Sequence, residues 1–368
     1  AQAISAPNQS LVIVSPVARI VHVPVMATFG HGSRWFENHF GFLEAQEAVK
    51  QNISVESGML YSRANNRKYS IGEFTTPSLE ELRREATLRL QDAGAVDKAK
   101  LKGTTGVRNV IGDVAEFHRR KENRYAVFQV ASQLNCLEFV HSDVTPEEGI
   151  TGYVQDRTQG PCCAIACGAG TLYRNYFAPI TSAKGNVIRT GQVAARQIEC
   201  LRDLAAALGN KRHGYLRVKN GYTLATDDGL VDLNKKLIDG LDEEGRDLLR
   251  GRLRVGVQRD VEVTSHSWGS QMVNDPGQLV TQVFGSACSV SYSGNRQDLW
   301  EPMARLVLEA SYEATLWAAV LSALRRPGRA ASRSVFLTAL GGGAFGNRME
   351  WVHDAIGRAI GKVCGQNG

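Results

Sequence analysis

The chain has 368 residues, of which 43% are hydrophobic and 22% are charged, so it can bury a large core and is not predominantly disordered. Its 43 basic and 37 acidic residues leave a formal net charge of +6, spread along the chain without a long basic run. This mild excess favours anionic small ligands or partners and does not predict nucleic-acid binding.

The seven cysteines are too few and too irregular for a disulfide framework, and Cys162, Cys163 and Cys167 fall in one apolar segment. Reduced and mostly buried thiols are typical of a cytoplasmic, reducing compartment. No apolar run approaches the roughly 18 residues that cross a bilayer. The N-terminal residues lack the basic start and apolar block of a signal peptide, so we expect no membrane partner.

The first third of the chain predicts mixed α and β structure. Residues 11–26 are β-branched and broken by two prolines, which is typical of an edge strand or an extended arm. An aromatic-rich helix is expected to begin near Ser33, and a hairpin to turn at Asn65-Asn66. A Pro-Ser pair followed by acidic residues predicts a further helix beginning at Ser78.

The remaining chain alternates between predicted strands and helices. Residues 122–132 predict a buried strand, residues 160–180 run from small residues into an aromatic helix, and residues 192–210 predict an amphipathic helix. Strands are expected at 221–226, 252–264, 278–292 and 334–340, and helices at 298–326 and 349–363. This alternation predicts an α/β fold, with helices covering a mixed or parallel sheet.

The polar stretch 92–106 is the best candidate for a boundary. We therefore expect residues 1–106 to form an N-terminal α+β extension that packs on a core of residues 107–368. The first part could also add strands to the same sheet instead of folding alone.

The segment "GGGAFGN", Gly341–Asn347, follows a predicted buried strand and precedes a helix. In open α/β sheets, ligands bind beyond the carboxyl ends of the strands. Consecutive glycines can expose their amide groups to an anion, and the next helix adds the positive end of its dipole. A diphosphate would suit such a loop, although a tight turn without a ligand explains the glycines too. Phe345 favours a ligand, because an aromatic loop tip suits an apolar surface such as a sugar or base.

A second candidate loop follows the predicted strand 122–132 and is unusually long and polar. Long polar connections are uncommon in compact domains unless they have a function. Gln133 and Asn135 follow the strand, and several acidic residues precede the "TQGP" stretch, where small residues let the backbone approach a ligand. The later "CGAGT" lacks the third glycine of a dinucleotide fingerprint and is a weak signal.

Together, "QVASQLN" and "GGGAFGN" resemble the macrodomain pattern. The segments "FENHFGFLE", "GEFTTPSLEELR", "DRTQGPCCAIACGAGTLYRNYF" and "LGGGAFGN" are similar to the divergent MavL-like macrodomain proteins, which remove ADP-ribose from modified arginine. The resemblance extends from about Trp35 to about Ile360. It implies a three-layer α/β/α macrodomain-like sandwich with a mixed sheet, and an ADP-ribosyl hydrolase that acts on an ADP-ribosylated protein. Ordinary macrodomains have a shorter first loop without "DRTQGP", so their catalytic residues are not transferred to this chain.

Hydrolysis of this N-glycosidic bond needs a carboxylate to stabilise an oxocarbenium-like transition state, and a group that activates water or protonates the leaving nitrogen. Asp156 is the first candidate for catalysis and Glu148 the second, with Glu147 and Asp143 in reserve. A solvated loop carboxylate is the alternative reading of each.

The resemblance also implies a set of ligand-binding residues in both loops. Asn135 is expected to bind the proximal ribose, with a cap or turn residue as the alternative. Gln159 and Gly160 would approach the same ribose or the phosphates. The full expected set is Gln133, Asn135, Thr158, Gln159, Gly160, Gly341, Gly342, Gly343, Ala344, Phe345, Gly346 and Asn347.

We expect no cofactor and no metal, with ADP-ribose as ligand or product. The eight histidines are scattered, and the three clustered cysteines lack a second ligand group. Glu301, Glu309 and Glu313 lie at near-helical spacing, which favours a solvated stripe over a di-metal site. A non-catalytic ADP-ribose reader and a structural protein are the competing hypotheses.

Overall fold

The structure is a computed structural model that describes residues 9–14, 34–94 and 105–365. Within these residues a central seven-stranded sheet has the order β5-β12-β15-β7-β16-β1-β6. Strand β12 is antiparallel to both of its neighbours, and the other adjacent pairs are parallel, so the expected mixed sheet is confirmed. The strands are β1 (Gln9–Val14), β5 (Glu73–Thr75), β6 (Thr105–Val110), β7 (Val127–Ala131), β12 (Gly256–Glu262), β15 (Leu279–Gly285) and β16 (Val335–Thr338).

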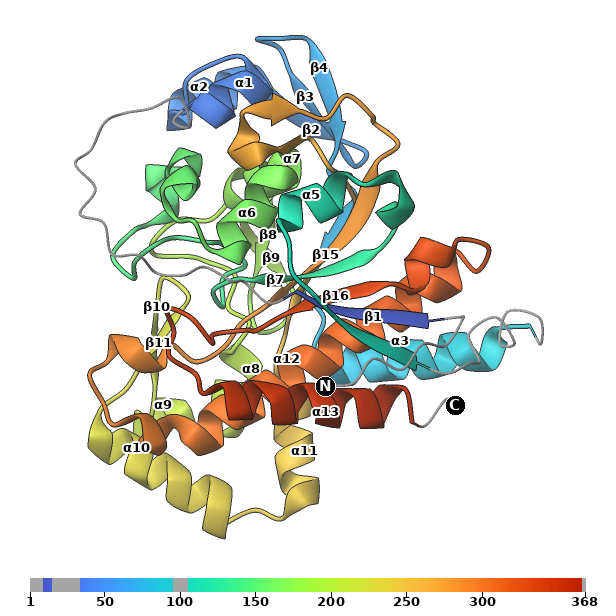
Figure 1. The fold of residues 1–368 in the computed structure, drawn as a ribbon. Helices are drawn as coiled ribbons and strands as arrows, with labels where there is room; N and C mark the ends of the chain where they lie inside the picture. Colours follow the sequence, from blue (N-terminus) through green and yellow to red (C-terminus); the bar gives the residue numbers. More distant parts are fainter. Residues whose placement is uncertain (1–8, 15–33, 95–104, 366–368) are drawn as a thin grey trace.

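Helices cover both faces of this sheet, as Figure 1 shows. One face carries α5 (Val114–Arg119), α6 (Gln159–Ala166) and α7 (Gly168–Tyr176). The other carries the long α12 (Gln297–Arg325) together with α13 (Met349–Val363) and α3 (Leu79–Asp92). The strands β7, β15 and β16 between these layers are almost wholly buried, which accounts for their largely apolar sequences. The predicted three-layer α/β/α class is confirmed.

The N-terminal part forms a small α+β unit that shares an apolar cluster with the loop after β7 and with α6 and α7. Two helices replace the single helix predicted from Ser33, because Gly41 takes a left-handed conformation at φ 81° and ends the first of them. Ser33 itself lies outside the described residues. The hairpin with its turn at Asn65-Asn66 and the helix capped by Ser78 are confirmed. The unit comprises α1 (Trp35–Phe40), α2 (Gln46–Asn52), β2 (Ile53–Glu56), β3 (Met59–Ser62) and β4 (Arg67–Ser70).

The N-terminal residues also contribute to the central sheet. β1 pairs with β16 on one side and β6 on the other, so it is an inner strand and not the predicted edge strand. Residues 15–26 of that predicted arm lie outside the described residues. β5 adds a strand at the opposite end of the sheet, and β6 runs across the expected boundary at residue 106. The N-terminal part is therefore built into the core sheet as well as packed on it.

The amphipathic helix predicted over 192–210 is wrong in extent. Only α8 (Arg202–Ala207) and α9 (Asn210–His213) form, and residues 192–201 are irregular. This stretch bonds to the loop after β7: the backbone N–H of Cys200 donates to the carbonyl of Leu134, and the side-chain amide of Gln192 donates to the carbonyl of Asn135. Tertiary hydrogen bonds thus replace helical ones.

The other described elements are peripheral to the sheet. They are β8 (Pro179–Thr181), β9 (Val187–Thr190), β10 (Arg217–Lys219), β11 (Tyr222–Leu224), α10 (Asp227–Asn234), α11 (Glu243–Arg252), β13 (Ser265–His266), β14 (Gln271–Met272), the π-helix η5 (Lys235–Asp239) and the 3-10 helices η2 (Lys121–Asn123), η3 (Pro146–Glu148), η4 (Thr151–Gln155), η6 (Ser267–Gly269), η7 (Val290–Tyr292) and η8 (Ala330–Arg333).

An ion-pair network ties α12 to the neighbouring helices. Glu313, at the middle of α12, is buried and binds the guanidinium groups of Arg83 on α3 and Arg358 on α13. Burial raises the pKa of Glu313, but the two arginines outweigh it and the pKa is lowered overall. The prediction of a solvated stripe is therefore wrong for this residue, and a buried carboxylate holds three helices together.

Replacing Glu313 by Gln should lower the free energy of unfolding by about 2 kcal/mol, because it leaves the partly buried Arg83 and Arg358 with Asp247 as their one remaining shared carboxylate. Urea unfolding at pH 7 measures this. Glu350→Gln is the matched control on α13, where the carboxylate is 73% exposed, and it should change stability by no more than about 0.5 kcal/mol. Equal losses in both variants would show that the network does not stabilise the layer.

Candidate functional site

The candidate site lies where neighbouring parallel strands send their chains to opposite faces. β7 leads through a long loop to α6 on one face, whereas β16 leads through the glycine loop to α13 on the other. Such a switch point opens a crevice beyond the carboxyl ends of the strands, and ligands of α/β proteins bind there. The loop that follows β15, also parallel to β7, reaches the same edge.

Helix α6 is seated directly on the end of β7. Pairing between β7 and β16 stops at Phe128. Beyond it, the Gln159 side chain makes the hydrogen bonds to β7 that a neighbouring strand would make. The amide of Gln159 donates to the carbonyl of Gln129 at 2.8 Å and accepts from the N–H of Ala131 at 2.8 Å. Gly160 follows, and any Cβ there would overlap the carbonyl oxygen of Ala131. The "TQGP" stretch therefore fixes the first turn of α6. Both the oxygen and the nitrogen of the Gln159 side-chain amide are hydrogen-bonded to β7.

The glycine loop is a closed turn fixed at its base. Gly341 and Gly346 adopt left-handed angles, φ 66° and 73°, which only glycine takes without strain. Asn347 is buried, and its amide donates to the carbonyl of Cys288 at 2.8 Å. The N–H of Asn347 closes the turn on the carbonyl of Gly341 at 2.8 Å. Asn347 therefore holds the loop's shape, and its side chain is directed inward.

The tip of this loop presents unused backbone donors. Gly343 and Ala344 are exposed and Phe345 is half-buried. The N–H groups of these three consecutive residues donate no hydrogen bond to the described part of the chain, whereas the N–H of Gly342 is used within the turn. Three consecutive free amides are the arrangement that binds phosphate oxygens in other proteins.

Phe345 belongs to an aromatic group that joins three loops. Its ring lies 5.3 Å from that of Tyr222 and 5.5 Å from that of Tyr292, and the two tyrosine rings are 4.9 Å apart. Tyr222 comes from β11, and Tyr292 from the loop after β15. The hydroxyl of Tyr222 donates to the carbonyl of Phe139 in the loop after β7 at 2.5 Å. We call Tyr222, Tyr292 and Phe345 the aromatic wall.

The Asp156 carboxylate lies within electrostatic range of the two tyrosines of the aromatic wall. Burial is the main cause that raises the pKa values of Tyr222 and Tyr292, and the nearby Asp156 carboxylate raises both further. Asp156 is half-buried, and one of its oxygens accepts from the N–H of Thr158 at 3.0 Å just before α6. The other oxygen has no partner among the described residues. Structure thus brings together Asp156 and the glycine loop, which the sequence separates by about 185 residues.

Gln133 and Asn135 are arranged differently from a pair of free ligand-binding amides. Both are buried. The Gln133 amide exchanges two hydrogen bonds with the backbone of Phe139, at 2.9 Å each. Asn135 accepts from the N–H of Leu137 and donates to the Gln197 side chain at 2.8 Å. The geometry matches the alternative reading of Asn135 as a turn residue, and both amides shape the loop.

The other acidic candidates make no direct described contact with the aromatic wall, although Asp143 pairs with His141, whose ring lies 6.3 Å from that of Tyr292. Glu148 is exposed and accepts from the N–H of Thr145 at 2.9 Å, which makes it the capping residue of its own 3-10 turn. Glu147 accepts from the N–H of Ala194, and Asp143 pairs with Lys219. Thr158 is exposed and caps α6 only through its backbone.

Sequence reasoning missed the buried support of the loop after β7. Arg174 on α7 is fully buried and donates to the carbonyl of Cys136 at 2.9 Å and to Glu138 at 3.4 Å. Burial raises the pKa of Glu138 to about 7, although Arg174 opposes the shift. No local sequence pattern marks Arg174 and Glu138 as partners, because they lie 36 residues apart on different elements. The buried Arg174–Glu138 pair thus stabilises the loop after β7.

No group of three His, Cys, Asp or Glu residues that could hold a metal occurs in the described ranges. Six of the seven cysteines are buried, and these six form no disulfide. Among the described residues, no helix is long and apolar enough to cross a membrane.

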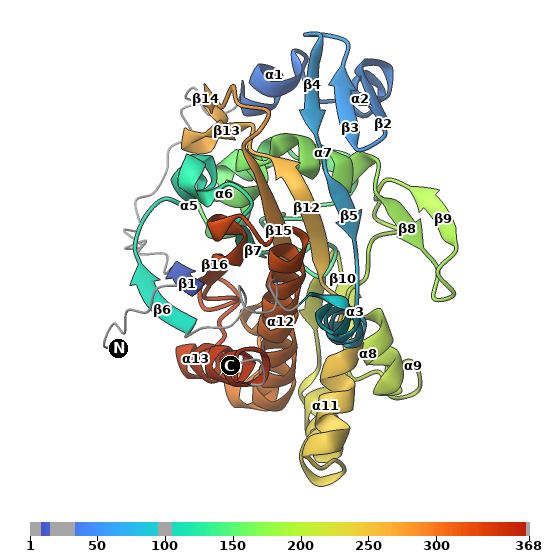
Figure 2. The ribbon, with the colours of Figure 1, turned by 90° about the vertical axis from the view of Figure 1, so that its right-hand side faces the viewer.

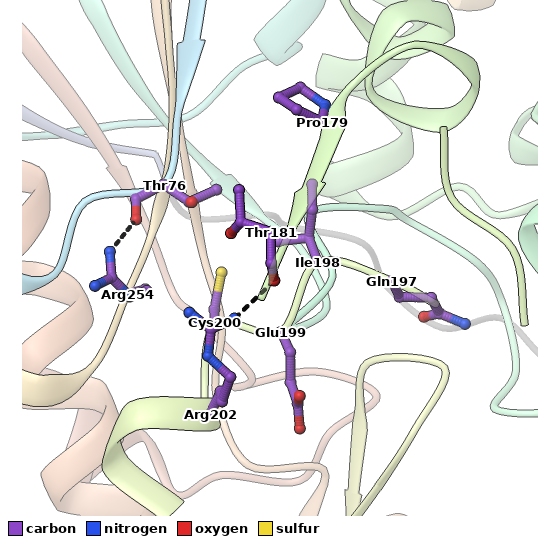
Figure 3. A pocket seen from close by; sticks show the side chains of 9 residues that line it. All are labelled: Thr76, Pro179, Thr181, Gln197, Ile198, Glu199, Cys200, Arg202 and Arg254. Carbon is purple, nitrogen blue, oxygen red and sulfur yellow. Dashed lines mark hydrogen bonds between the residues drawn. The ribbon is translucent and has the colours of Figure 1, made fainter. Parts of the chain in front are cut away.

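A small enclosed pocket lies outside the candidate site (Figure 3). Its cavity volume is about 20 Å³, which is room for about one water molecule. Arg254 and Arg202 line it, but their side chains donate to the carbonyls of Thr76 and Thr181 and pair with Asp203. This pocket does not suit a nucleotide. Its lining is Thr76, Pro179, Thr181, Gln197, Ile198, Glu199, Cys200, Arg202 and Arg254.

Comparison with known proteins gives one faint structural similarity. No protein-family model matches the chain, and the search of curated proteins gives no match. The X-ray structure of poly(ADP-ribose) glycohydrolase from Thermomonospora curvata is similar with a TM-score of 0.33 and 12% sequence identity. The match covers 88% of this chain and 84% of that one. At this TM-score the similarity carries no argument about function.

Replacing Gly346 by Ala should lower the free energy of unfolding by about 2 kcal/mol or more, because the new methyl group meets a left-handed backbone and overlaps the Ser291 hydroxyl. Gly343→Ala is the matched control in the same loop: its Cβ has open space, and stability should stay within about 1 kcal/mol of the wild type. Thermal or urea unfolding compares them. A Gly343→Ala loss as large as that of Gly346→Ala would contradict the loop's described shape.

Proposed function

We propose that the protein binds ADP-ribose and removes it from a modified protein side chain, with arginine as the proposed acceptor. The observation that carries the proposal is the meeting of Asp156, the aromatic wall and the free amides of the glycine loop at one switch point. The sequence resemblance to MavL-like macrodomain proteins supplies the chemistry of the ligand, and the geometry supports it.

In this proposal the diphosphate lies on the N–H groups of Gly343, Ala344 and Phe345. The N-terminus of the 15-residue α13 follows at once and adds the positive end of its dipole. Arg348, the next exposed cation, makes no ion pair with an acid in the described ranges, so its charge is available to an anion. The ring of Phe345 would cover the ribose on that side.

Asp156 is the proposed catalytic carboxylate. As the bond between the anomeric carbon and the guanidinium nitrogen breaks, positive charge develops on the sugar, and a carboxylate beside it lowers the barrier. Water then adds to the anomeric carbon, one of its protons goes to the leaving nitrogen, and the products are free ADP-ribose and unmodified arginine. The half-buried position of Asp156 next to two phenol groups limits the water that would screen its charge.

The remaining expected ligand-binding residues have a supporting role in this proposal. Gln159, Gly160 and Thr158 hold α6 and Asp156 in place, and Gln133 and Asn135 hold the loop after β7. Their role in this proposal is to fix the walls of the site, with the backbone of "TQGP" nearest the ligand.

A non-catalytic reader of ADP-ribose is the second candidate, and one observation favours it. Among the sequence candidates, Asp156 is the carboxylate whose charge acts on both tyrosines of the aromatic wall, whereas Glu148 is bound to its own turn. A reader needs the diphosphate loop and the aromatic wall but no second acid. Binding without release of ADP-ribose would identify this function.

Asp156→Asn should lower the rate of ADP-ribose release from an arginine-modified protein by about 100-fold or more, because the amide cannot stabilise the developing charge. Affinity for free ADP-ribose, measured by calorimetry, should stay within about tenfold, since the diphosphate loop is intact. Glu148→Gln is the matched control and should retain activity.

Two results would contradict this account. Full activity of Asp156→Asn would exclude the proposed catalytic carboxylate. Binding of ADP-ribose by a wild type that releases none from modified arginine would replace the hydrolase by the reader.

A further inference from the structure

One segment carries the whole charge excess of the protein. Residues 181–220 contain eight Lys and Arg residues and two acidic residues, so this tenth of the chain accounts for the entire net charge of +6. Outside it, basic and acidic residues balance. The excess looks dispersed in the sequence because apolar residues and turns separate the basic positions.

The fold brings this segment to one side of the molecule. Figure 2 shows β8, β9, α8 and α9 together along the side opposite β1 and α5. Arg202, just inside α8, donates to the carbonyl of Thr181 in β8, which ties the helix to the hairpin. α9 then leads directly into β10. β8, β9, α8 and α9, which carry most of the segment's basic residues, therefore lie on one side of the molecule.

Six of the eight basic side chains are exposed, and none forms an ion pair with an acid in the described ranges. The two others are paired: Arg202 with Asp203, and Lys219 with Asp143. Exposed basic residues without a described ion pair, such as Arg84, Lys121 and Arg348, also occur elsewhere in the described ranges. This side differs in that one segment holds six of them and only two acidic residues. The basic face is defined as Lys184, Arg189, Arg196, Lys211, Arg212 and Arg217.

An open strand edge with exposed apolar side chains adjoins these charges. β9 pairs with β8 and with no other described strand, so its outer edge is free to take another strand. Val187 and Ile188 on β9 are 61% and 52% exposed, and Arg189 follows them. Extended peptides bind such edges through backbone hydrogen bonds, and flanking side chains select their sequence.

We propose that the basic face with β9 is a docking surface for an extended, acidic segment of a partner protein that also carries apolar residues. The segment's backbone pairs with β9, its apolar side chains contact Val187 and Ile188, and its carboxylates lie against the basic face. Charge complementarity sets both the partner's composition and the rate of encounter.

The composition of this surface favours a polypeptide over other polyanions. Single-stranded nucleic acids bind where aromatic side chains stack on bases, and the one aromatic residue of the segment, Tyr215, is buried. Binding to an anionic membrane by an amphipathic helix needs a broad apolar helix face, but α9 has four residues and no buried or exposed apolar side chain.

This proposal does not rest on the ADP-ribose site, although the two surfaces adjoin. Gln197, next to Arg196, accepts a hydrogen bond from Asn135 in the loop after β7. A partner held on the basic face would thus lie beside that loop.

The test measures binding of a fluorescein-labelled peptide of twelve alternating Glu and Val residues by fluorescence anisotropy, with the full chain at low salt. Binding should weaken by about tenfold or more when sodium chloride rises from 20 to 200 mM, given the screening of exposed charges. The variant Lys184→Glu, Arg189→Glu, Arg196→Glu should lose at least about tenfold in affinity.

The matched control reverses three exposed basic residues elsewhere, Arg63→Glu, Lys68→Glu and Lys121→Glu, and so has the same net charge. It should bind the peptide like the wild type. Equal loss in both variants, no binding of the peptide by the wild type, or tighter binding of a DNA oligonucleotide or of phosphatidylserine vesicles through the same residues would overturn the proposal.

Discussion

The contact on which the site depends is the close approach of α6 to the end of β7. At Gly160 no side chain separates the helix from the carbonyl of Ala131, and the Gln159 amide occupies the hydrogen-bonding edge that β16 leaves open. Because α6 begins there, the residues just before it are held beside the carboxyl end of β7. Asp156 is one of them, and its Asx-type bond to Thr158 follows from the same helix start.

The carboxyl ends of the parallel strands are bordered by three loops that hydrogen bonds join to one another. The glycine loop is closed by Asn347, the loop after β15 bonds to it through Ser291, and Ser289 exchanges hydrogen bonds with Thr223 on β11. These bonds bring the aromatic wall together. Because the walls are built from bonded backbone, a ligand would find the free amides already in place, and the entropy lost on binding is correspondingly small.

Much of the fold follows from local sequence patterns, and the site follows from them only in part. Strands such as β7 and β16 and helices such as α13 were predictable because burial on both faces or one face leaves a clear apolar period. The glycine loop was predictable from its position after a strand. Tyr222 and Tyr292 were not, since their proximity depends on packing between loops. Amides such as Gln159 were expected to contact the ligand. Buried backbone groups also need hydrogen-bond partners, and the Gln159 side chain is such a partner for Ala131.

The central claim is that Asp156 and the glycine loop are two walls of one ADP-ribose site. A crystal structure of the protein with ADP-ribose tests it most directly. The account predicts diphosphate oxygens within hydrogen-bonding distance of the N–H groups of Gly343, Ala344 and Phe345, and the anomeric carbon facing Asp156. A diphosphate bound away from this loop, or a ribose with Asp156 on its far side, would contradict it.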